Sequence, residues 1–136
     1  MQITQIKNTP EVIYPDLSFE IVGAAFVVSN RLGWGMGEKY YQRALAEEFV
    51  SRKIPFRREA FIPLSYGGKK LGSYFADFIV DGKILLELKV VHRLGYTHSK
   101  QVLEYLKKAN VRLGILLYFT RDGVKYRRIL NPSFSD

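Results

Sequence analysis

The sequence predicts an α/β protein: a mixed β-sheet, made of a three-stranded antiparallel meander plus a parallel crossover strand, flanked by α-helices. Two N-terminal stretches repeat apolar residues at helical spacing. The pairs Gly67-Gly68 and Asp81-Gly82 divide residues 56–91 into three strand-like runs, and a helical stretch then precedes another apolar run. With 136 residues, 47% hydrophobic and 25% charged, we expect a single domain over residues 1–136.

The N-terminal region is predicted to contain a loose arm, residues 1–15, followed by the first helix. The helix is expected to begin at Asp16 or Ser18, either of which could serve as its N-cap. Apolar residues recur at helical spacing through LSFEIVGAAFVVSNRLG and should form the buried face. These residues are Leu17, Ile21, Ala24, Ala25 and Val28.

A second helix is predicted for residues 36–52, after a glycine-rich break. Tyr41, Leu45 and Phe49 recur at four-residue steps and should face the core. Glu38 lies three residues before Tyr41 and therefore borders this apolar face. A carboxylate in that position is a candidate functional group.

Three strands are predicted next, in residues 56–66, 69–80 and 83–91. The Gly67-Gly68 and Asp81-Gly82 pairs suit two-residue hairpin turns, because such turns require positive φ angles. The three segments should therefore pair as an antiparallel meander.

A two-residue second turn would fix the pairing of the strands on either side of it. Val80 would lie opposite Lys83, and Asp77 would lie opposite Leu86. In this register Asp77 and Glu87 point to opposite faces of the sheet. A bulge, a twist or a splayed strand would be needed to bring the two carboxylates together.

The C-terminal part predicts a helix, a crossover strand and a basic edge strand. THSKQVLEYLKKA, residues 97–109, has helical spacing, with Thr97 as a plausible cap. VRLGILLYF, residues 111–119, has the length of a buried strand, and the intervening helix implies parallel pairing with the strand before it. RDGVKYRRIL, residues 121–130, reads as a turn and an edge strand.

Charged residues interrupt the apolar third strand, KILLELKVV. This segment is too apolar to be an exposed edge, and buried charges are usually paired or metal-bound. Two carboxylates, Asp77 and Glu87, with a backbone carbonyl would be oxygen ligands suited to Mg²⁺. Lys89 could hold an attacking water or stabilise a charged transition state. The alternative is a solvated Glu87–Lys89 pair with little energetic effect.

Three segments in order resemble the motifs of the GxxExxY family, which belongs to the PD-(D/E)XK nuclease superfamily. They are GMGEKYY, ADFIVDGKILLELK and HSKQVLEYLK, and the likeness extends from about Leu17 to Asn131. Ala76 stands where the superfamily name has proline, while the aspartate, glutamate and lysine of the core motif are all present. The resemblance implies a restriction-endonuclease-like core.

The resemblance also implies roles for individual residues. Asp77 and Glu87 would bind Mg²⁺, for which Mn²⁺ could substitute, and Lys89 would serve the attacking water. Glu38 would approach as an accessory carboxylate, and Gln101 would orient Lys89 or contact the phosphate backbone. In the superfamily the second strand commonly bends at the aspartate, which answers the register difficulty.

The charge distribution indicates a polyanionic partner. The formal net charge is +8, and residues 88–136 contain ten basic side chains against three acidic ones. Such asymmetry is typical of a nucleic-acid-binding surface, and we expect DNA rather than RNA. The basic residues expected to contact phosphates are Lys100, Lys107, Lys108, Arg127 and Arg128.

Several classes of function are disfavoured by the sequence. There is no cysteine, which removes disulfides and thiol chemistry and fits a reducing compartment. No signal peptide or membrane span is recognisable, so we expect a cytoplasmic protein without membrane partners. We therefore expect a metal-dependent nuclease that hydrolyses phosphodiester bonds. The alternative is a non-catalytic nucleic-acid-binding or protein-interaction module with the same fold. A homodimer is compatible with either.

Overall fold

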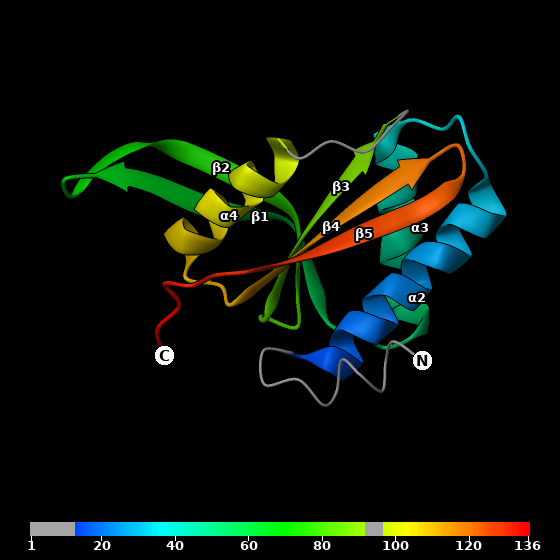
Figure 1. Cartoon of the computed structure of the whole chain (residues 1–136), viewed down its shortest axis with the longest axis horizontal. Helices are drawn as coiled ribbons and strands as arrows, with labels where there is room; N and C mark the ends of the chain where they lie inside the picture. Colours follow the sequence, from blue (N-terminus) through cyan, green and yellow to red (C-terminus); the bar gives the residue numbers. More distant parts are fainter. Residues whose placement is uncertain (1–12, 92–96) are drawn as a thin grey trace.

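The computed structural model describes residues 13–91 and 97–136, in which one mixed sheet lies between helices (Figure 1). The strands follow the order β1-β2-β3-β4-β5; β3 and β4 are parallel and the other neighbours antiparallel. This confirms the predicted fold class. The elements are α2 (Pro15–Leu32), α3 (Glu38–Ser51), β1 (Phe56–Tyr66), β2 (Lys69–Val80), β3 (Ile84–Val90), α4 (Thr97–Ala109), β4 (Leu113–Thr120) and β5 (Gly123–Leu130).

Helix α2 begins at Pro15, so the predicted N-cap at Asp16 or Ser18 is wrong. Tyr14 occupies the N-cap position without a side-chain capping bond. Proline is favoured at the first helical position because its fixed φ suits the helix and its missing N–H needs no partner. The predicted apolar face is confirmed, with Ile21, Ala24, Ala25 and Val28 buried. Most of the predicted arm, residues 1–12, lies outside the described residues.

Helix α3 packs through the apolar face that its spacing predicts. Tyr41, Leu45 and Phe49 are all fully or almost fully buried. The Tyr41 ring stacks on Phe119 of β4 with the ring centroids 4.4 Å apart, and its hydroxyl donates to the Gly33 carbonyl at 2.6 Å. These contacts fix the beginning of the helix against the sheet.

The turn between β2 and β3 contains three residues rather than the predicted two. Asp81 and Gly82 have φ angles of 52° and 66°, and the Lys83 N–H donates to the Val80 carbonyl at 2.9 Å. Val80 consequently pairs with Ile84, and the predicted Val80–Lys83 pairing is wrong. The whole register moves by one residue.

This shift removes the separation that the sequence predicted for the two carboxylates. The β2–β3 pairing ends at Phe78 opposite Leu86. Extending the same register by one step sets Asp77 across from Glu87. The two strands separate at this position, which we call the fork.

Strand β2 bends at the fork while it remains paired with β1. Phe78 packs with the core formed by α2 and α3, whereas Ala76 packs with the core beneath α4. Residues two apart on a regular strand share a face, so the strand must turn between them. On β1, Glu59 lies at the same level and has a φ of 49°. The bend at Asp77 that the resemblance implies is therefore present.

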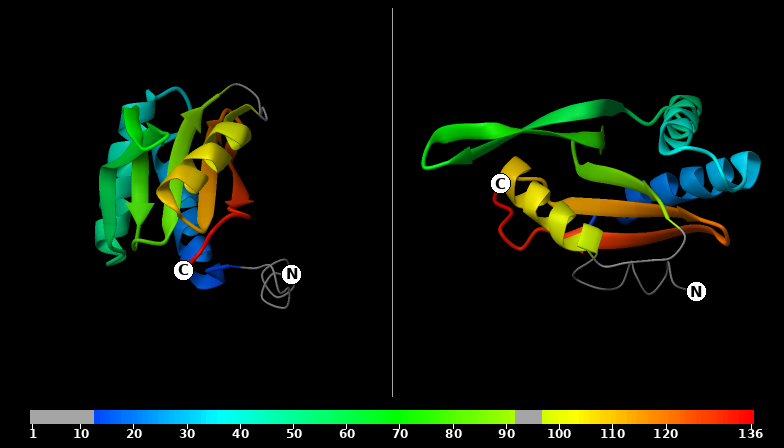
Figure 2. Two further views of the ribbon diagram at one scale, coloured as in Figure 1. Left: turned by 90° about the vertical axis from the view of Figure 1, so that its left-hand side faces the viewer. Right: turned by 90° about the horizontal axis from the view of Figure 1, so that it is seen from above.

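Helix α4 connects the parallel strands β3 and β4 and covers the face of the sheet opposite to α2 and α3 (Figure 2). Val102 and Leu106 are buried against β4. The side chain of Thr97, the predicted cap, lies outside the described residues, as does the preceding loop of residues 92–96. Strand β5 completes the edge of the sheet beside β4.

The close approach of α4 to β4 depends on Gly114. A Cβ atom there would lie 2.9 Å from Val102 Cγ1 and 3.2 Å from both Leu106 methyl groups. We expect Gly114→Ala to lower the free energy of unfolding by about 1–3 kcal/mol, measured by urea denaturation, because the core has no room to adjust freely. Gly72→Ala is the control, since nothing lies within 4 Å of its Cβ. An equal loss in both variants would contradict the packing argument.

No helix within residues 13–91 and 97–136 has both the length and the apolar character needed to cross a membrane.

Candidate active site

The fork is held by carboxylates that take the place of strand pairing. Asp77 Oδ2 accepts a hydrogen bond from the Leu88 backbone N–H at 2.8 Å. In return, the backbone N–H of Asp77 donates to Glu87 Oε2 at 3.1 Å. Each side chain thus satisfies a backbone donor on the other strand where the regular ladder has stopped. Both carboxylates are consequently fixed at one point between β2 and β3.

Helix α3 contributes a residue that sequence reasoning missed. Gln42 Nε2 donates to Asp77 Oδ1 at 2.9 Å, so both oxygens of this carboxylate are held. Gln42 lies one helical turn after Glu38 and therefore on the same helix face. That spacing was the available signal, but a glutamine on a helix carries little chemical information by itself.

Glu87 is the most enclosed charged group of the site, with only 5% of its surface exposed. The Tyr74 hydroxyl hydrogen-bonds to its carboxylate. The Tyr74 ring stacks on Tyr105 of α4, with centroids 3.4 Å apart. Burial, and next the charge of Glu87, raise the pKa of Tyr74, so its hydroxyl stays protonated as a donor. The contact of Tyr74 with Glu87 was also missed, because the bend in β2 decides which face of the sheet the Tyr74 side chain occupies.

Burial makes the ionised carboxylates of the fork unfavourable. It raises the pKa of Glu87 to about 7, with a further contribution from the charge of Asp77. Burial also raises the pKa of Asp77, against the opposing effects of the Leu88 N–H and Lys89. The pKa of Glu38, the first residue of α3, is raised by burial as well. A cation placed here would relieve both the desolvation and the repulsion.

Lys89 is a cationic side chain whose charge acts on all three carboxylates. It is half-buried on β3, two residues after Glu87, and its charge favours ionisation of Asp77, Glu87 and Glu38. Burial and the charge of Lys89 lower the pKa of His98 in the first turn of α4. The structure thus brings Asp77 and Glu87 together, and the charges of Lys89 and Glu38 act at the same place. Their joint role as a catalytic site stays a prediction.

A model of the PD-(D/E)XK nuclease superfamily matches residues 15–129. The chain belongs to the PD-(D/E)XK nuclease superfamily. The match covers every described helix and almost every strand position, including the fork and Lys89. No curated protein matches the chain.

A solved structure of an exonuclease shares this fold. The alkaline exonuclease LHK-Exo from Laribacter hongkongensis has a TM-score of 0.51 at 11% identity, covering 96% of this chain and 75% of that one. Its complex with dAMP gives 0.49 at 12% identity, with the same coverages. The protein SSO0001 gives 0.45 at 17% identity, covering 85% and 77%. At 11% identity the likeness to LHK-Exo shows the fold alone.

Nucleases of the PD-(D/E)XK superfamily generally depend on a divalent metal ion, and the donors at the fork fit one. Among the described residues, no group of three or more His, Cys, Asp or Glu side chains could hold a metal ion. Mg²⁺ does not require three protein ligands, because it commonly binds one or two carboxylates and keeps several waters. Asp77 and Glu87 supply two carboxylates whose charged forms are destabilised without a cation.

Gln101, the remaining residue expected at the site, is exposed on α4. None of the hydrogen bonds found within residues 13–91 and 97–136 joins it to Lys89. The charge of Lys89 instead affects the pKa of His98, one turn earlier on α4. The ring centroid of His98 lies 6.1 Å from that of Tyr118. Contact of Gln101 with a phosphate backbone stays a prediction.

The basic residues expected to contact phosphates occupy different environments. Lys100, Lys107 and Lys108 are exposed on α4, and Lys107 forms an ion pair with Glu104 at 3.5 Å. Arg127 and Arg128 are half-buried on β5. Arg128 donates to the Ile13 carbonyl, so its guanidinium already has a structural partner.

Strand register places further basic groups beside the fork. Arg127 follows Glu87 in one row across the sheet, through Leu116 of β4. Lys125 follows Lys89 in the next such row, through Tyr118. One strand, β4, lies between the members of each row, so they are two inter-strand spacings apart, which corresponds to about 10 Å. Lys125, which sequence reasoning did not single out, is thus aligned with the site.

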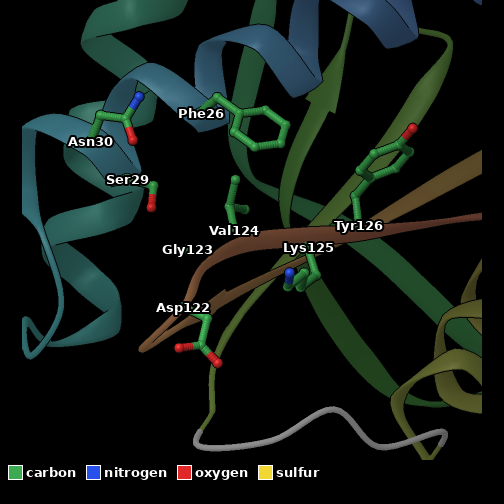
Figure 3. Close-up of a pocket in the computed structure, with 8 residues that line it drawn as sticks. All are labelled: Phe26, Ser29, Asn30, Asp122, Gly123, Val124, Lys125 and Tyr126. Atoms are coloured by element: carbon green, nitrogen blue, oxygen red, sulfur yellow. The ribbon is translucent and has the colours of Figure 1, made fainter. Parts of the chain in front are cut away.

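A pocket of about 490 Å³ lies elsewhere, between α2 and the beginning of β5 (Figure 3). Val124 and Tyr126 extend towards Phe26 of α2, whereas Lys125 points to the other side of the strand. The pocket contains none of the carboxylates of the fork. The paired carboxylates and Lys89 lie at the fork and not in this pocket.

Proposed function

We propose that the protein is a metal-dependent nuclease of the GxxExxY family that hydrolyses phosphodiester bonds of DNA. The observation that carries this proposal is the fork, where Asp77 and Glu87 are brought together beside Lys89 with raised carboxyl pKa values. Asp77 and Glu87 would hold Mg²⁺, which Mn²⁺ could replace. A bound divalent ion supplies Lewis-acid charge and lowers the pKa of a bound water.

The protein groups around the fork position the reactants. The Lys89 ammonium can donate to the attacking water or to a phosphate oxygen on which negative charge develops. Gln42 and the Leu88 N–H keep the Asp77 carboxylate in one orientation, because each donates to a different oxygen. Glu38 completes the acidic wall as an accessory carboxylate. Gln101 and the exposed lysines of α4 would hold the substrate backbone.

The wider setting is part of the same proposal. Residues 1–136 would act as a single domain, and the lack of cysteine fits a reducing, cytoplasmic compartment. DNA is favoured over RNA as the partner, and the net charge of +8 should make its binding depend strongly on salt.

The test is cleavage of plasmid and single-stranded DNA with Mg²⁺, Mn²⁺ or excess EDTA. We expect products with either metal and none in EDTA. Binding is followed in EDTA at increasing salt, and its affinity should fall steeply because phosphate contacts release counterions. DNA binding without cleavage in either metal would instead identify a non-catalytic binding module.

Tyr74 should control how well the fork holds metal. Tyr74→Phe removes the hydroxyl that hydrogen-bonds to Glu87 but keeps the ring stacked on Tyr105. Loss of such an outer partner typically weakens metal binding by about 10- to 100-fold, and we expect this range for Mn²⁺ measured by calorimetry. Tyr105→Phe is the control, because the Tyr105 hydroxyl does not hydrogen-bond to Glu87. Only burial and then the charge of Glu87 raise the pKa of Tyr105. Equal losses in both variants would refute the role of the Tyr74 hydroxyl.

A further inference from the structure

Beyond the fork, β1 and β2 continue as a two-stranded arm, which we define as residues 60–76. The arm extends past the rest of the sheet, with α4 along one of its sides (Figures 1 and 2). Its inner face carries Ala60, Ile62 and Ala76, which pack into the core beneath α4. The alternate side chains form an outer face directed away from α4.

The outer face is unusually aromatic for a solvent-exposed surface. Phe61 and Phe75 are 49% and 55% exposed, and their rings meet edge to face with centroids 5.7 Å apart. Leu71, nearer the tip, is 71% exposed. Exposed aromatic rings that contact one another in this way often mark a binding site.

Basic charge accompanies these rings. Lys70 Nζ lies 5.2 Å from the ring centroid of Phe61, within the range of a cation–π contact. Residues 57–76 hold four basic side chains and one acidic one, Glu59. Aromatic rings beside lysines suit a ligand that has both flat π-systems and negative charge, and a nucleic acid strand has both.

The position of the face connects it to the fork. Phe75 precedes Asp77 by two residues on β2, which is about 7 Å along a strand. A nucleic acid strand lying on Phe61 and Phe75 would therefore reach the carboxylates within a few nucleotides.

We propose that the outer face of the arm is a stacking platform for unpaired bases of a single-stranded nucleic acid that continues into the fork. This inference rests on the proposed function for the identity of the fork. Stacking on exposed rings requires bases whose faces are free, and in a duplex those faces are covered by neighbouring base pairs. Duplex DNA would contact the same surface only through its phosphates, so the platform selects single strands.

The test compares the affinities of full-length variants for single-stranded and duplex DNA, by fluorescence anisotropy with oligonucleotides of about 16 nucleotides. EDTA is present throughout, so cleavage does not interfere. For the double variant Phe61→Ala/Phe75→Ala we expect the affinity for the single strand to fall at least about tenfold. Its affinity for duplex should change by less than about twofold, because the phosphate contacts remain.

Two variants serve as controls. Phe61→Tyr/Phe75→Tyr keeps both rings and should bind single strands like the unmodified protein. Phe19→Ala/Phe26→Ala removes two aromatic side chains of α2 with comparable exposure, 55% and 46%, and should also leave binding unchanged. Thermal unfolding of every variant verifies that the fold is retained.

Three results would overturn the platform: unchanged single-strand affinity in the double alanine variant, an equal loss of duplex affinity, or conversion of a dimer into monomers. The last, measured by sedimentation, would mean that the arm contacts a second copy of the chain. Metal-dependent cleavage is scored separately. If the unmodified protein cleaves DNA but the double alanine variant keeps its single-strand affinity, only the platform is refuted. If the variant selectively loses single-strand affinity but the unmodified protein cleaves nothing, the nuclease function is refuted and the binding platform stands.

Discussion

Asp77→Asn, Glu87→Gln and Lys89→Met are each expected to reduce metal-dependent cleavage by at least about a thousandfold. The two amides retain the size of the carboxylates but lose the charge that would hold a divalent ion. Loss of several kcal/mol of transition-state stabilisation corresponds to at least this factor. Lys89→Met removes the ammonium donor while keeping a side chain of similar length.

The measurement is the initial rate of plasmid cleavage at saturating Mg²⁺, together with DNA affinity in EDTA. Affinity should change by less than about tenfold, because phosphate contacts lie mostly on other residues. Asp81→Asn is a matched control on the same hairpin, where an exposed carboxylate pairs with Lys83 at 3.2 Å. Full activity in Asp77→Asn or Glu87→Gln would show that the chemistry lies elsewhere.

The metal-free protein should lose stability as pH rises, and Glu87 should be the main cause. Its pKa is about 7 when folded, against an ordinary value of 4.5. A carboxyl that binds its proton more tightly in the folded chain stabilises the fold below the unfolded pKa. That stabilisation is lost as pH rises through the folded pKa. Between about pH 5 and about pH 8 the loss should approach 2–3 kcal/mol.

The experiment compares urea unfolding of the natural chain and Glu87→Gln in EDTA across this range. Other titrating groups are common to both proteins, so the difference between the two curves isolates Glu87. We expect the variant to gain stability relative to the natural chain as pH rises, and Mg²⁺ to remove the difference by stabilising only the natural chain. The neighbouring ionisable groups that shape the titration are Asp77 and Tyr74 on β2, Lys89 on β3 and Tyr105 on α4. If the free energies of unfolding of the two proteins changed with pH in parallel, Glu87 would not be the cause of the pH dependence.

Much of the fold was predictable because its local signals agree with one another. Apolar spacing identified the helices and strands, and the glycine pairs marked both hairpins. The predicted register between β2 and β3 was wrong by one residue. Lys83 has the sequence character of β3, but it belongs to a turn in which Asp81 adopts a positive φ. Aspartate tolerates that conformation, yet nothing in the sequence requires it.

The candidate site was predictable where charges interrupt apolar strands, as at Asp77, Glu87 and Lys89. Gln42 and Tyr74 were not, since their contacts depend on the docking of α3 and on a bend that reverses the faces of β2. Alternation along a strand predicts a face only while the strand stays regular. Residues beyond the bend can be assigned only from coordinates.

The exchange of hydrogen bonds at the fork has a mechanical consequence. Oε2 of Glu87 and Oδ2 of Asp77 tie β2 to β3 where the strands would otherwise separate. A ligand that draws these oxygens away would weaken the two hydrogen bonds between β2 and β3. Binding at the fork should therefore be coupled to the direction of the arm. We expect a ligand bound at the fork to change the direction of the hairpin.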